Sequence, residues 1–277
     1  MVERTQLANG LEISRILTGL WQIADMEREG SFMNPEEGAL EMHRYVDAGF
    51  TTFDMADHYG TSELIAGQYQ ADWPGSGELL TKWVPKPGTA AREEARAAVE
   101  LALERMGREQ IDLLQFHAWS YSDPGWLDCM FCLQELKEEG LIQHLGLTNT
   151  DATHVAMLLN SGVDVVSNQV CYSLLDQRAS SAMTDLCLQY DIKLLAFGTL
   201  AGGFLTEQWL GVAEPDFQSL ETWSQMKYKR FIDAAGGWDK FQVLLAALER
   251  VARRFEVSVA NVASRVILDA PAVAGVI

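Results

Sequence analysis

The sequence alternates between strand-like and helix-like segments along almost its whole length, and this alternation constrains the fold more than any other feature. The strand-like segments are short, apolar and rich in β-branched or aromatic residues. Eight of them stand at residues 15–21, 51–57, 78–84, 111–117, 143–149, 164–170, 192–199 and 273–277. Strands that alternate with helices form a parallel sheet covered by helices, and eight such units indicate a closed barrel. We therefore predict an α/β protein with a (β/α)8 TIM barrel.

Helical patterns fill the segments between these strands, at residues 34–47, 62–70, 90–106, 126–139, 152–160, 180–190 and 241–255. The first has clear start signals, because Asn34 can cap a helix whose first turn holds Pro35 and two glutamates. Upstream, residues 5–17 form two short runs around Asn9-Gly10, a strong hairpin signal, and we expect this hairpin to plug or cover the barrel. No linker or low-complexity tract interrupts the pattern, so we expect one domain over residues 1–277.

The charge balance argues against several kinds of partner. Lys and Arg number 21 against 39 Asp and Glu, a formal net charge of -18, which repels nucleic acid and anionic membranes. The nearest basic patch, residues 227–230 in a long predicted loop, is either solvated surface or a local anion site, and both interpretations stay open. With no apolar run of about 18 residues and no signal-peptide pattern, we expect a cytoplasmic protein.

Cysteine usage adds little chemistry. Cys129 and Cys132 form a C-x-x-C motif within a predicted amphipathic helix, not at the start of one. A redox pair or zinc site usually stands at a helix start or in a loop, so we interpret these as buried thiols on a helix face. No metal site is predicted.

Polar residues gather at the ends of the predicted strands, where a barrel of this kind carries its chemistry. Asp54 lies on the inner face of the second strand, and a buried carboxylate there needs a cation or hydrogen-bond donors. Tyr59 follows the same strand, while Lys82 and His117 end the third and fourth. Taken alone, Asp54 is equally well explained as a turn cap and Tyr59 as a rim residue. The convergence of four such groups on one mouth favours a functional site.

These four residue types suit the protonation of a carbonyl group. A phenol with its ordinary pKa of about 10 is a weak acid at neutral pH. A neighbouring ammonium stabilises the phenolate, and a carboxylate holds the ammonium in place. Tyr59, Lys82 and Asp54 could play these parts, and the imidazole of His117 could orient the carbonyl oxygen.

At this point the chain resembles the aldo-keto reductases, in the branch of bacterial general reductases and potassium-channel β subunits. The segments that carry the resemblance lie at residues 53–60, 81–82, 112–117, 146–149, 168–175 and 196–204. The resemblance implies an NAD(P)H-dependent reductase of small aldehydes or ketones, with NADP as the expected cofactor and NAD as the alternative. It implies Tyr59 as general acid/base, Lys82 and Asp54 as its tuning pair, and His117 in the substrate oxyanion site.

The same resemblance implies a set of binding residues. Asn149 and Gln169 would bind the nicotinamide carboxamide, Phe197 would stack on the ring, and the backbone after it would approach the diphosphate. The full set implied for the cofactor is Thr148, Asn149, Gln169, Phe197, Gly198, Thr199 and Leu200. Trp21 and Trp119, after the first and fourth strands, would wall the carbonyl pocket. Trp83 neighbours inward-pointing Lys82, so strand alternation predicts that Trp83 faces outward.

The sequence also departs from the family pattern. Gly198-Thr199 replaces the usual Ser-Pro, and Met55 replaces a common Thr. The printed sequence stops at Ile277, part-way through the predicted eighth strand, without the family's following loop and final helix. We expect an incomplete C-terminal end, an uncovered apolar patch, weakened cofactor binding and lowered stability.

Two other function classes compete with the reductase. A regulatory or sensor protein would keep the fold and cofactor but show little turnover. A metal-dependent hydrolase would use Asp54, Asp57, His58 and His117, although no second histidine follows at a ligand spacing. The sequence leaves the substrate, the choice of NADP or NAD, and the oligomeric state open.

Overall fold

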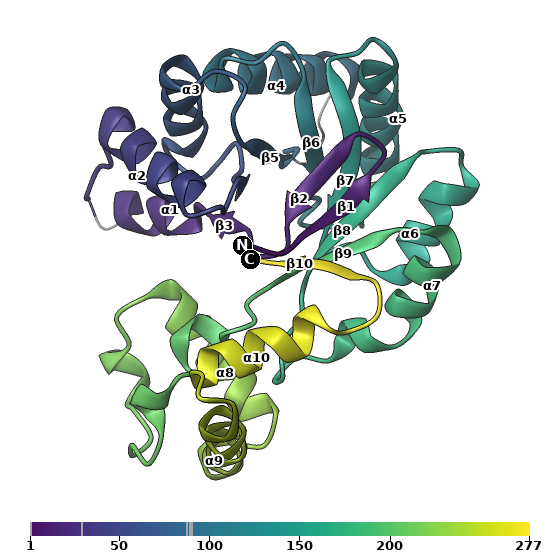
Figure 1. Ribbon diagram of the computed structural model, residues 1–277. Coiled ribbons are helices and arrows are strands. Elements are labelled where there is room, and N and C mark those ends of the chain that lie inside the picture. Colours follow the sequence, from purple (N-terminus) through teal and green to yellow (C-terminus); the bar gives the residue numbers. More distant parts are fainter. Residues whose placement is uncertain (1, 29, 87, 89–90) are drawn as a thin grey trace.

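The protein is a parallel eight-stranded sheet surrounded by helices (Figure 1). The computed structural model describes residues 2–28, 30–86, 88 and 91–277. Neighbouring strands in the sheet follow one another in the chain, each pair parallel. In order, the strands are β3 (Thr18–Gly19), β4 (Thr52–Asp54), β5 (Glu78–Trp83), β6 (Ile111–Phe116), β7 (Ile142–Thr148), β8 (Val165–Cys171), β9 (Lys193–Phe197) and β10 (Val273–Val276).

The first and last strands of the sheet meet, so the sheet is a closed barrel. The Leu17 amide donates to the Val276 carbonyl at 2.8 Å, and the Val276 amide donates to the Arg15 carbonyl at 2.9 Å. Ile16 and Val276 form a parallel bridge between these segments. Closure removes both sheet edges, and the predicted (β/α)8 barrel is confirmed.

The helices cover the outside of this barrel. In order they are α1 (Trp21–Arg28), α2 (Pro35–Asp47), α3 (Ser62–Asp72), α4 (Ala91–Met106), α5 (Gly125–Glu138), α6 (Ala152–Asn160), α7 (Ala182–Tyr190), α8 (Trp223–Ala234), α9 (Trp238–Phe255) and α10 (Val259–Leu268). Outward side chains such as Phe53, Met55 and Trp83 belong to the main core with residues of the helices, which confirms the outward orientation predicted for Trp83. Among the described residues no helix has the length and apolarity required to span a bilayer.

Several predicted elements need correction. The first strand is much shorter than residues 15–21, because Trp21 already begins α1. Helices α1, α8 and α10 were not predicted. The basic residues 227–230 therefore lie on a helix and not in a loop. The predicted start of the third helix at Ala90 lies outside the described residues. Asn34 caps α2 as expected, accepting a hydrogen bond from the Glu36 amide at 2.8 Å.

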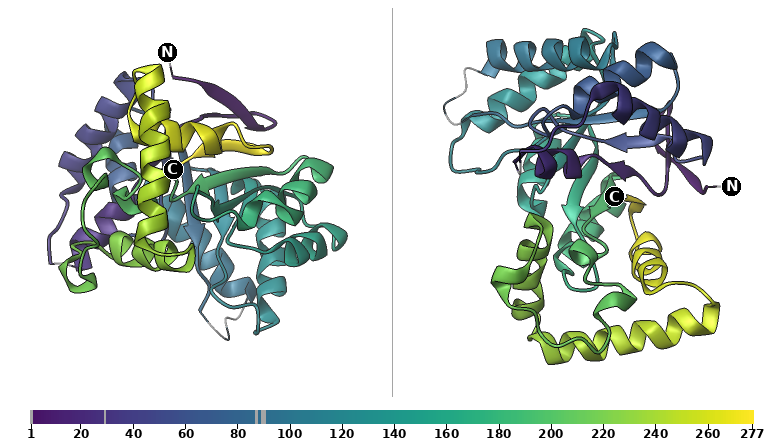
Figure 2. Two further views of the ribbon diagram at one scale, coloured as in Figure 1. Left: turned by 90° about the horizontal axis from the view of Figure 1, so that it is seen from below. Right: turned by 90° about the vertical axis from the view of Figure 1, so that its left-hand side faces the viewer.

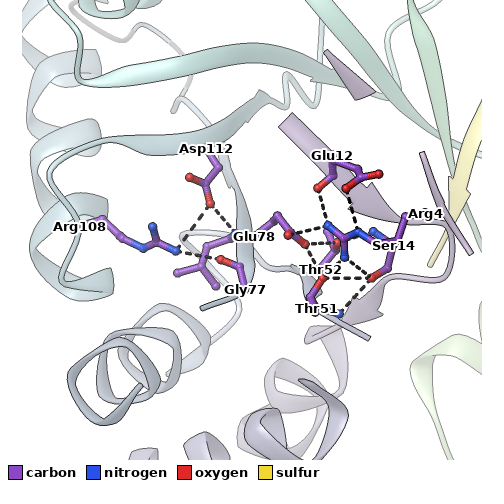
Figure 3. A network of polar contacts seen from close by, with 10 residues as sticks. Arg4, Glu12, Ser14, Thr51, Thr52, Gly77, Glu78, Arg108 and Asp112 are labelled. Atoms are coloured by element: carbon purple, nitrogen blue, oxygen red, sulfur yellow. Dashed lines mark hydrogen bonds and ion pairs between the residues drawn. The ribbon is translucent and has the colours of Figure 1, made fainter. Parts of the chain in front are cut away.

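The N-terminal hairpin plugs the barrel at the end opposite the candidate site. Its strands, β1 (Arg4–Ala8) and β2 (Leu11–Ser14), are antiparallel, and their leucines share a small core with inward-facing Leu80 and Leu113. Figure 3 shows how polar contacts fasten the hairpin to the barrel. Arg4 donates to Glu78 at 2.8 Å, and Glu78 in turn accepts from the Thr52 hydroxyl at 2.6 Å.

Helices α8, α9 and α10 form a second core with the segment that follows β9. Figures 1 and 2 show α8 and α9 on one side of the sheet, away from α2, α3, α4 and α5. Phe204 is buried there, with Trp209 at 4.8 Å and Trp238 at 6.0 Å between ring centroids. These two tryptophans therefore pack in the core, while Trp223 is exposed at the start of α8.

An apolar groove lies beside the seam where β10 meets the first strand. It has a volume of about 790 Å³, and its lining includes Ile16, Phe50, Phe255, Val257 and Val266. Phe255 leaves 66% of its surface exposed. An uncovered apolar patch was predicted on the outer barrel, and the structure contains one.

Candidate active site

Asp54 and Lys82 form a buried ion pair at the centre of the barrel. Asp54 ends β4 and Lys82 lies in β5, and both side chains point inward because they alternate with outward-facing Phe53 and Trp83. Lys82 Nζ donates to Asp54 Oδ2 at 2.6 Å and to the Met55 carbonyl at 2.9 Å. Lys82 is only 1% exposed and Asp54 only 3% exposed. Burial lowers the pKa of Lys82, and the charge of Asp54 opposes that shift.

Two buried amides complete the surroundings of Asp54. Gln115 Nε2 donates to Asp54 Oδ1 at 2.9 Å, and Gln169 Nε2 donates to the same oxygen at 2.7 Å. Gln169 Nε2 also donates to Gln115 Oε1 at 2.9 Å. Side chains from β4, β5, β6 and β8 thus fix the Asp54 carboxylate. Because the Gln169 amide nitrogen is used here, its carbonyl oxygen is the group left to accept a hydrogen bond from a ligand.

Tyr59 lies next to the buried pair. Its ring centroid is 5.0 Å from Lys82 Nζ, close enough for the ammonium to act on the ring and on a developing phenolate. The segment that carries Tyr59 is held to β5, since the Asp57 amide donates to the Lys82 carbonyl at 3.0 Å. The structure therefore brings Tyr59, Lys82 and Asp54 together.

His117 stands at the same mouth, at the end of β6. Its amide donates to the Trp83 carbonyl at 3.0 Å, and its Nδ1 is buried without a hydrogen-bond partner among the described residues. Burial, followed by the electrostatic effects of Lys82 and His58, lowers the pKa of His117 from 6.5 to about 4. The imidazole is therefore neutral at physiological pH.

Aromatic side chains surround this group. Trp21 meets Tyr59 edge to face, with ring centroids 5.0 Å apart. Trp119 is 75% exposed, and its ring lies 6.1 Å from that of His58. His58 also lies 4.8 Å from Tyr59 and 6.5 Å from His117, so it links the two.

The residues implied for cofactor binding lie at the ends of β7, β8 and β9. The Thr148 hydroxyl is buried and has no hydrogen-bond partner among the described residues. Asn149 is exposed with φ 55°, a conformation that asparagine tolerates, and its amide donates to the Gln169 carbonyl at 2.8 Å. Phe197 ends β9 and is partly buried.

The turn after Phe197 offers unpaired hydrogen-bond donors. The backbone amides of Gly198, Thr199 and Leu200 meet no acceptor in the part of the chain that the structure describes. Successive free amides attract anions. Together with the free Thr148 hydroxyl and the Gln169 carbonyl, they fit a dinucleotide, which carries an amide at one end and a diphosphate in the middle.

Some site residues were not assigned from the sequence. Gln115 shares the inner face of β6 with His117, so strand alternation could have identified it. His58 was considered only as a metal ligand, whereas its Nδ1 lies 2.7 Å from Asp57 Oδ1 and its ring packs on Tyr59. Lys227, which belongs to the basic patch at residues 227–230, lies on α8 over Phe197, next to the residues implied for cofactor binding, and the sequence did not predict this position because α8 was not predicted.

The alternative sites have a different character. Cys129 is buried and Cys132 partly buried on α5, and burial raises the pKa of Cys129 to about 11. Both therefore behave as helix-face thiols. In the described part of the chain no three His, Cys, Asp or Glu side chains form a group that could hold a metal ion. Asp54, which a metal site would need, is surrounded by donors instead.

Comparison with known proteins places this geometry in context. The model of the aldo/keto reductase family matches residues 15–277. The NADH-specific methylglyoxal reductase of Escherichia coli is 28% identical over 226 residues, with 71% of this chain and 66% of that protein covered. Flagellar radial spoke protein 5 of Chlamydomonas reinhardtii is 27% identical over 235 residues, covering 71% and 44%. The matched region thus spans less than two thirds of the length of either relative.

Other matches cover a larger share of the matched protein. An uncharacterized oxidoreductase of Bacillus subtilis is 30% identical over 223 residues, covering 73% of this chain and 72% of that one. Among solved structures, a glycerol dehydrogenase of Gluconobacter oxydans superposes with a TM-score of 0.79 at 23% identity, covering 96% and 82%. An aldo-keto reductase of Bacillus halodurans gives 0.73 at 21% identity, covering 100% and 84%. These structural likenesses support the barrel fold.

Proposed function

Because this chain belongs to the aldo/keto reductase family, we propose that it reduces small aldehydes or ketones with NAD(P)H. The single observation that carries this proposal is the contact of Tyr59 with the buried Lys82 and Asp54 pair, 5.0 Å from ring centroid to ammonium. A bound nicotinamide cofactor would supply a hydride to the carbonyl carbon.

Each protein group has a defined part in this reaction. Tyr59 donates its phenolic proton to the carbonyl oxygen and recovers a proton from solvent after product leaves. Lys82 stabilises the phenolate, and Asp54 with the two glutamines keeps the ammonium in position. Neutral His117 can donate an N–H to the carbonyl oxygen and orient it toward Tyr59. Trp21 and Trp119 border the space where the carbonyl compound would lie.

Replacing the phenol tests this mechanism. We expect Tyr59→Phe to lower kcat/KM by roughly 100-fold or more, the scale of general acid catalysis, while the cofactor Kd changes by less than about threefold. Methylglyoxal and an aromatic aldehyde serve as probe substrates, with NADPH oxidation as the readout. Tyr190→Phe, an exposed tyrosine on α7, is the matched control. Undiminished turnover in Tyr59→Phe would contradict the assignment.

The nicotinamide site is proposed on the groups that remain unpaired. Asn149 and the Gln169 carbonyl would hold the carboxamide, the Thr148 hydroxyl would lie beside it, and Phe197 would stack on the ring. The amides of Gly198, Thr199 and Leu200 would meet the diphosphate. We propose NADPH as the preferred donor on the family resemblance. The name of the Escherichia coli relative makes NADH the alternative, and parallel titrations with both decide between them.

A sensor or structural protein is the second candidate. The relative from Chlamydomonas reinhardtii is named as a flagellar spoke protein, so membership of this family does not require an enzymatic role. Saturable cofactor binding without turnover of any carbonyl probe would favour this candidate.

We further propose one domain over residues 1–277, supported by the single family match over residues 15–277. The expected cytoplasmic location stays a prediction, and the oligomeric state is still to be measured.

A further inference from the structure

Glu63 is a buried carboxylate that the proposed reaction does not use. It stands in the first turn of α3, and only 2% of its surface is exposed. Burial raises the pKa of Glu63, and hydrogen bonds from Thr81 and Arg105 oppose that shift. An acidic residue at a helix start interacts favourably with the helix dipole in solvent as well, whereas burying a carboxylate costs free energy unless partners compensate it. The helix start alone therefore does not explain why this carboxylate is buried.

Two partners join Glu63 to neighbouring elements. The hydroxyl of Thr81, which directly precedes Lys82 on β5, donates to Glu63 Oε1 at 2.6 Å. Arg105, in the last turn of α4, donates from Nη1 to Glu63 Oε2 at 3.2 Å. One carboxylate thus connects α3, α4 and β5.

The same Arg105 nitrogen reaches the segment that carries Tyr59. Arg105 Nη1 donates to the Asp57 carbonyl in a long contact of 3.4 Å. From the side of β5, the Val84 amide donates to Asp57 Oδ2 at 3.2 Å. Within the described ranges Arg105 has no further polar partner, so the position of its guanidinium depends on Glu63. Asp57 is therefore held from α4 on one side and from β5 on the other.

Close packing between α3 and α4 brings Arg105 to these two oxygen atoms. Gly67 lies one turn after Glu63 on the same face of α3, and a Cβ at this glycine would lie 1.9 Å from the Arg105 carbonyl oxygen. The backbones of the two helices therefore meet at this point. This contact fixes where the Arg105 side chain leaves α4, and the guanidinium meets Glu63 and Asp57 together.

We propose that Glu63 is a positioning residue, which through Arg105 and Thr81 sets the position of Tyr59 relative to Lys82. This inference rests on the proposed function. The effect of the ammonium on the phenolate falls with distance, so Tyr59 has to be held close to Lys82 Nζ, which lies 5.0 Å from its ring centroid. Hydrogen bonds to a carboxylate are stronger than bonds to a neutral amide, so Glu63 holds both donors more firmly than a glutamine would.

The test compares two variants of α3 with methylglyoxal and NADPH. Glu63→Gln keeps the shape of the side chain, and we expect kcat to fall by about 10- to 100-fold, the scale of a small misplacement of a reacting group, while the NADPH Kd changes by less than about twofold. Gln70→Met is the matched control, because Gln70 is buried on the same helix but donates to the Ser76 carbonyl at 2.7 Å. Its kcat should stay within about twofold of the wild type. Equal losses of kcat in the two variants would overturn the proposal, since any loosening of α3 would then impair turnover.

A double variant separates positioning of Tyr59 from other effects. If Glu63 acts through Tyr59, adding Glu63→Gln to Tyr59→Phe should lower kcat by less than about a further twofold. A further loss as large as that of Glu63→Gln alone would overturn the inference. Should Glu63→Gln fail to fold, Arg105→Met tests the same link from α4. Arg105→Lys should then recover most of the kcat lost in Arg105→Met, because an ammonium can reach the same two oxygen atoms, and failure to recover it would count against the link.

The outcomes also separate this inference from the proposed function. Wild-type kcat in Glu63→Gln, with turnover lost in Tyr59→Phe, would overturn the inference and leave the proposed function standing. Undiminished turnover in Tyr59→Phe would contradict the proposed function itself.

Discussion

At the scale of single residues, the site depends on the charged ammonium of Lys82, which the barrel can bury only with partners that compensate the charge. Lys82 is acceptable in the interior only because Asp54 and the Met55 carbonyl meet its ammonium. Asp54 in turn accepts three hydrogen bonds, one from Lys82 and one each from Gln115 and Gln169. The two glutamines are therefore positioning residues for the pair that acts on Tyr59.

Asp54→Asn should be strongly destabilising. The variant keeps the shape of the side chain but leaves Lys82 as an uncompensated buried charge, and removing one partner of such a pair costs about 3–5 kcal/mol. Urea unfolding monitored by tryptophan fluorescence measures the loss. Glu12→Gln, which breaks the exposed ion pair with Arg4, is the control and should cost less than about 1 kcal/mol. Equal losses of unfolding free energy in the two variants would show that the buried ion pair contributes no more to stability than the exposed one.

His117 should make stability fall with acid. Its folded pKa of about 4 lies below the ordinary 6.5, so the fold favours the neutral imidazole. The neutral His117 imidazole contributes at most roughly 3 kcal/mol to the free energy of unfolding. This contribution is complete above about pH 6.5 and is lost as the pH falls toward 4. Unfolding free energies of the wild type and His117→Gln should therefore converge between pH 7 and 4. If the unfolding free energies of the two proteins instead change in parallel with pH, His117 does not cause the acid sensitivity.

At the scale of elements, the sequence predicted best where a local pattern repeats. The helix at residues 152–160 was predicted with the bounds of α6, and β5 to β10 were located within two residues at each end, whereas the predicted second strand runs three residues past the end of β4. Of the site, Asp54, Lys82 and Tyr59 could be assigned because alternation and strand ends fix their direction. The first strand failed because Trp21 starts a helix. The role of α8 could not be read at all, since its docking depends on Gly198 and Gly202, which are distant in sequence.

The docking of α8 can be tested at Gly198. In Gly198→Ala a methyl group would adopt a left-handed backbone conformation and also collide with Tyr228 Oη, so we expect a loss of stability of about 2–4 kcal/mol and weaker cofactor binding. Gly211→Ala is the control, because Gly211 has φ 73° with open space around its Cα, and it should cost about 1 kcal/mol. The difference in melting temperature between the variants isolates the contact with α8. If both variants melt together, close packing at Gly198 is unimportant.

At the scale of the whole molecule, the two ends of the barrel have different tasks. The hairpin, its ion pairs and apolar residues fill the end that Figure 3 shows, while the opposite end carries the candidate site around Tyr59, Lys82 and His117. Barrels of this kind keep stability and chemistry on separate faces. Substitutions such as Arg4→Met should therefore reduce stability with little change in the chemistry at Tyr59.

The apolar groove beside β10 should be visible in solution. We expect the folded chain of residues 1–277 to bind the fluorescent dye ANS there, and Phe255→Gln to reduce the signal. Because Phe255 is largely exposed, the variant should unfold within about 0.5 kcal/mol of the wild type. Leu188→Gln, an exposed apolar residue on α7 outside the groove, is the control. Identical dye binding by all three proteins would mean that the groove does not admit the dye.

The seam between Ile16 and Val276 has a consequence for biosynthesis. The first strand emerges from the ribosome early, but its pairing partner is made about 260 residues later, so the ring cannot close during most of translation. During that interval the nascent chain exposes an unpaired sheet edge, which can pair with a strand of another chain. Newly made chains should therefore depend on chaperones until β10 arrives, and slow codons placed before it should increase aggregation rather than improve yield.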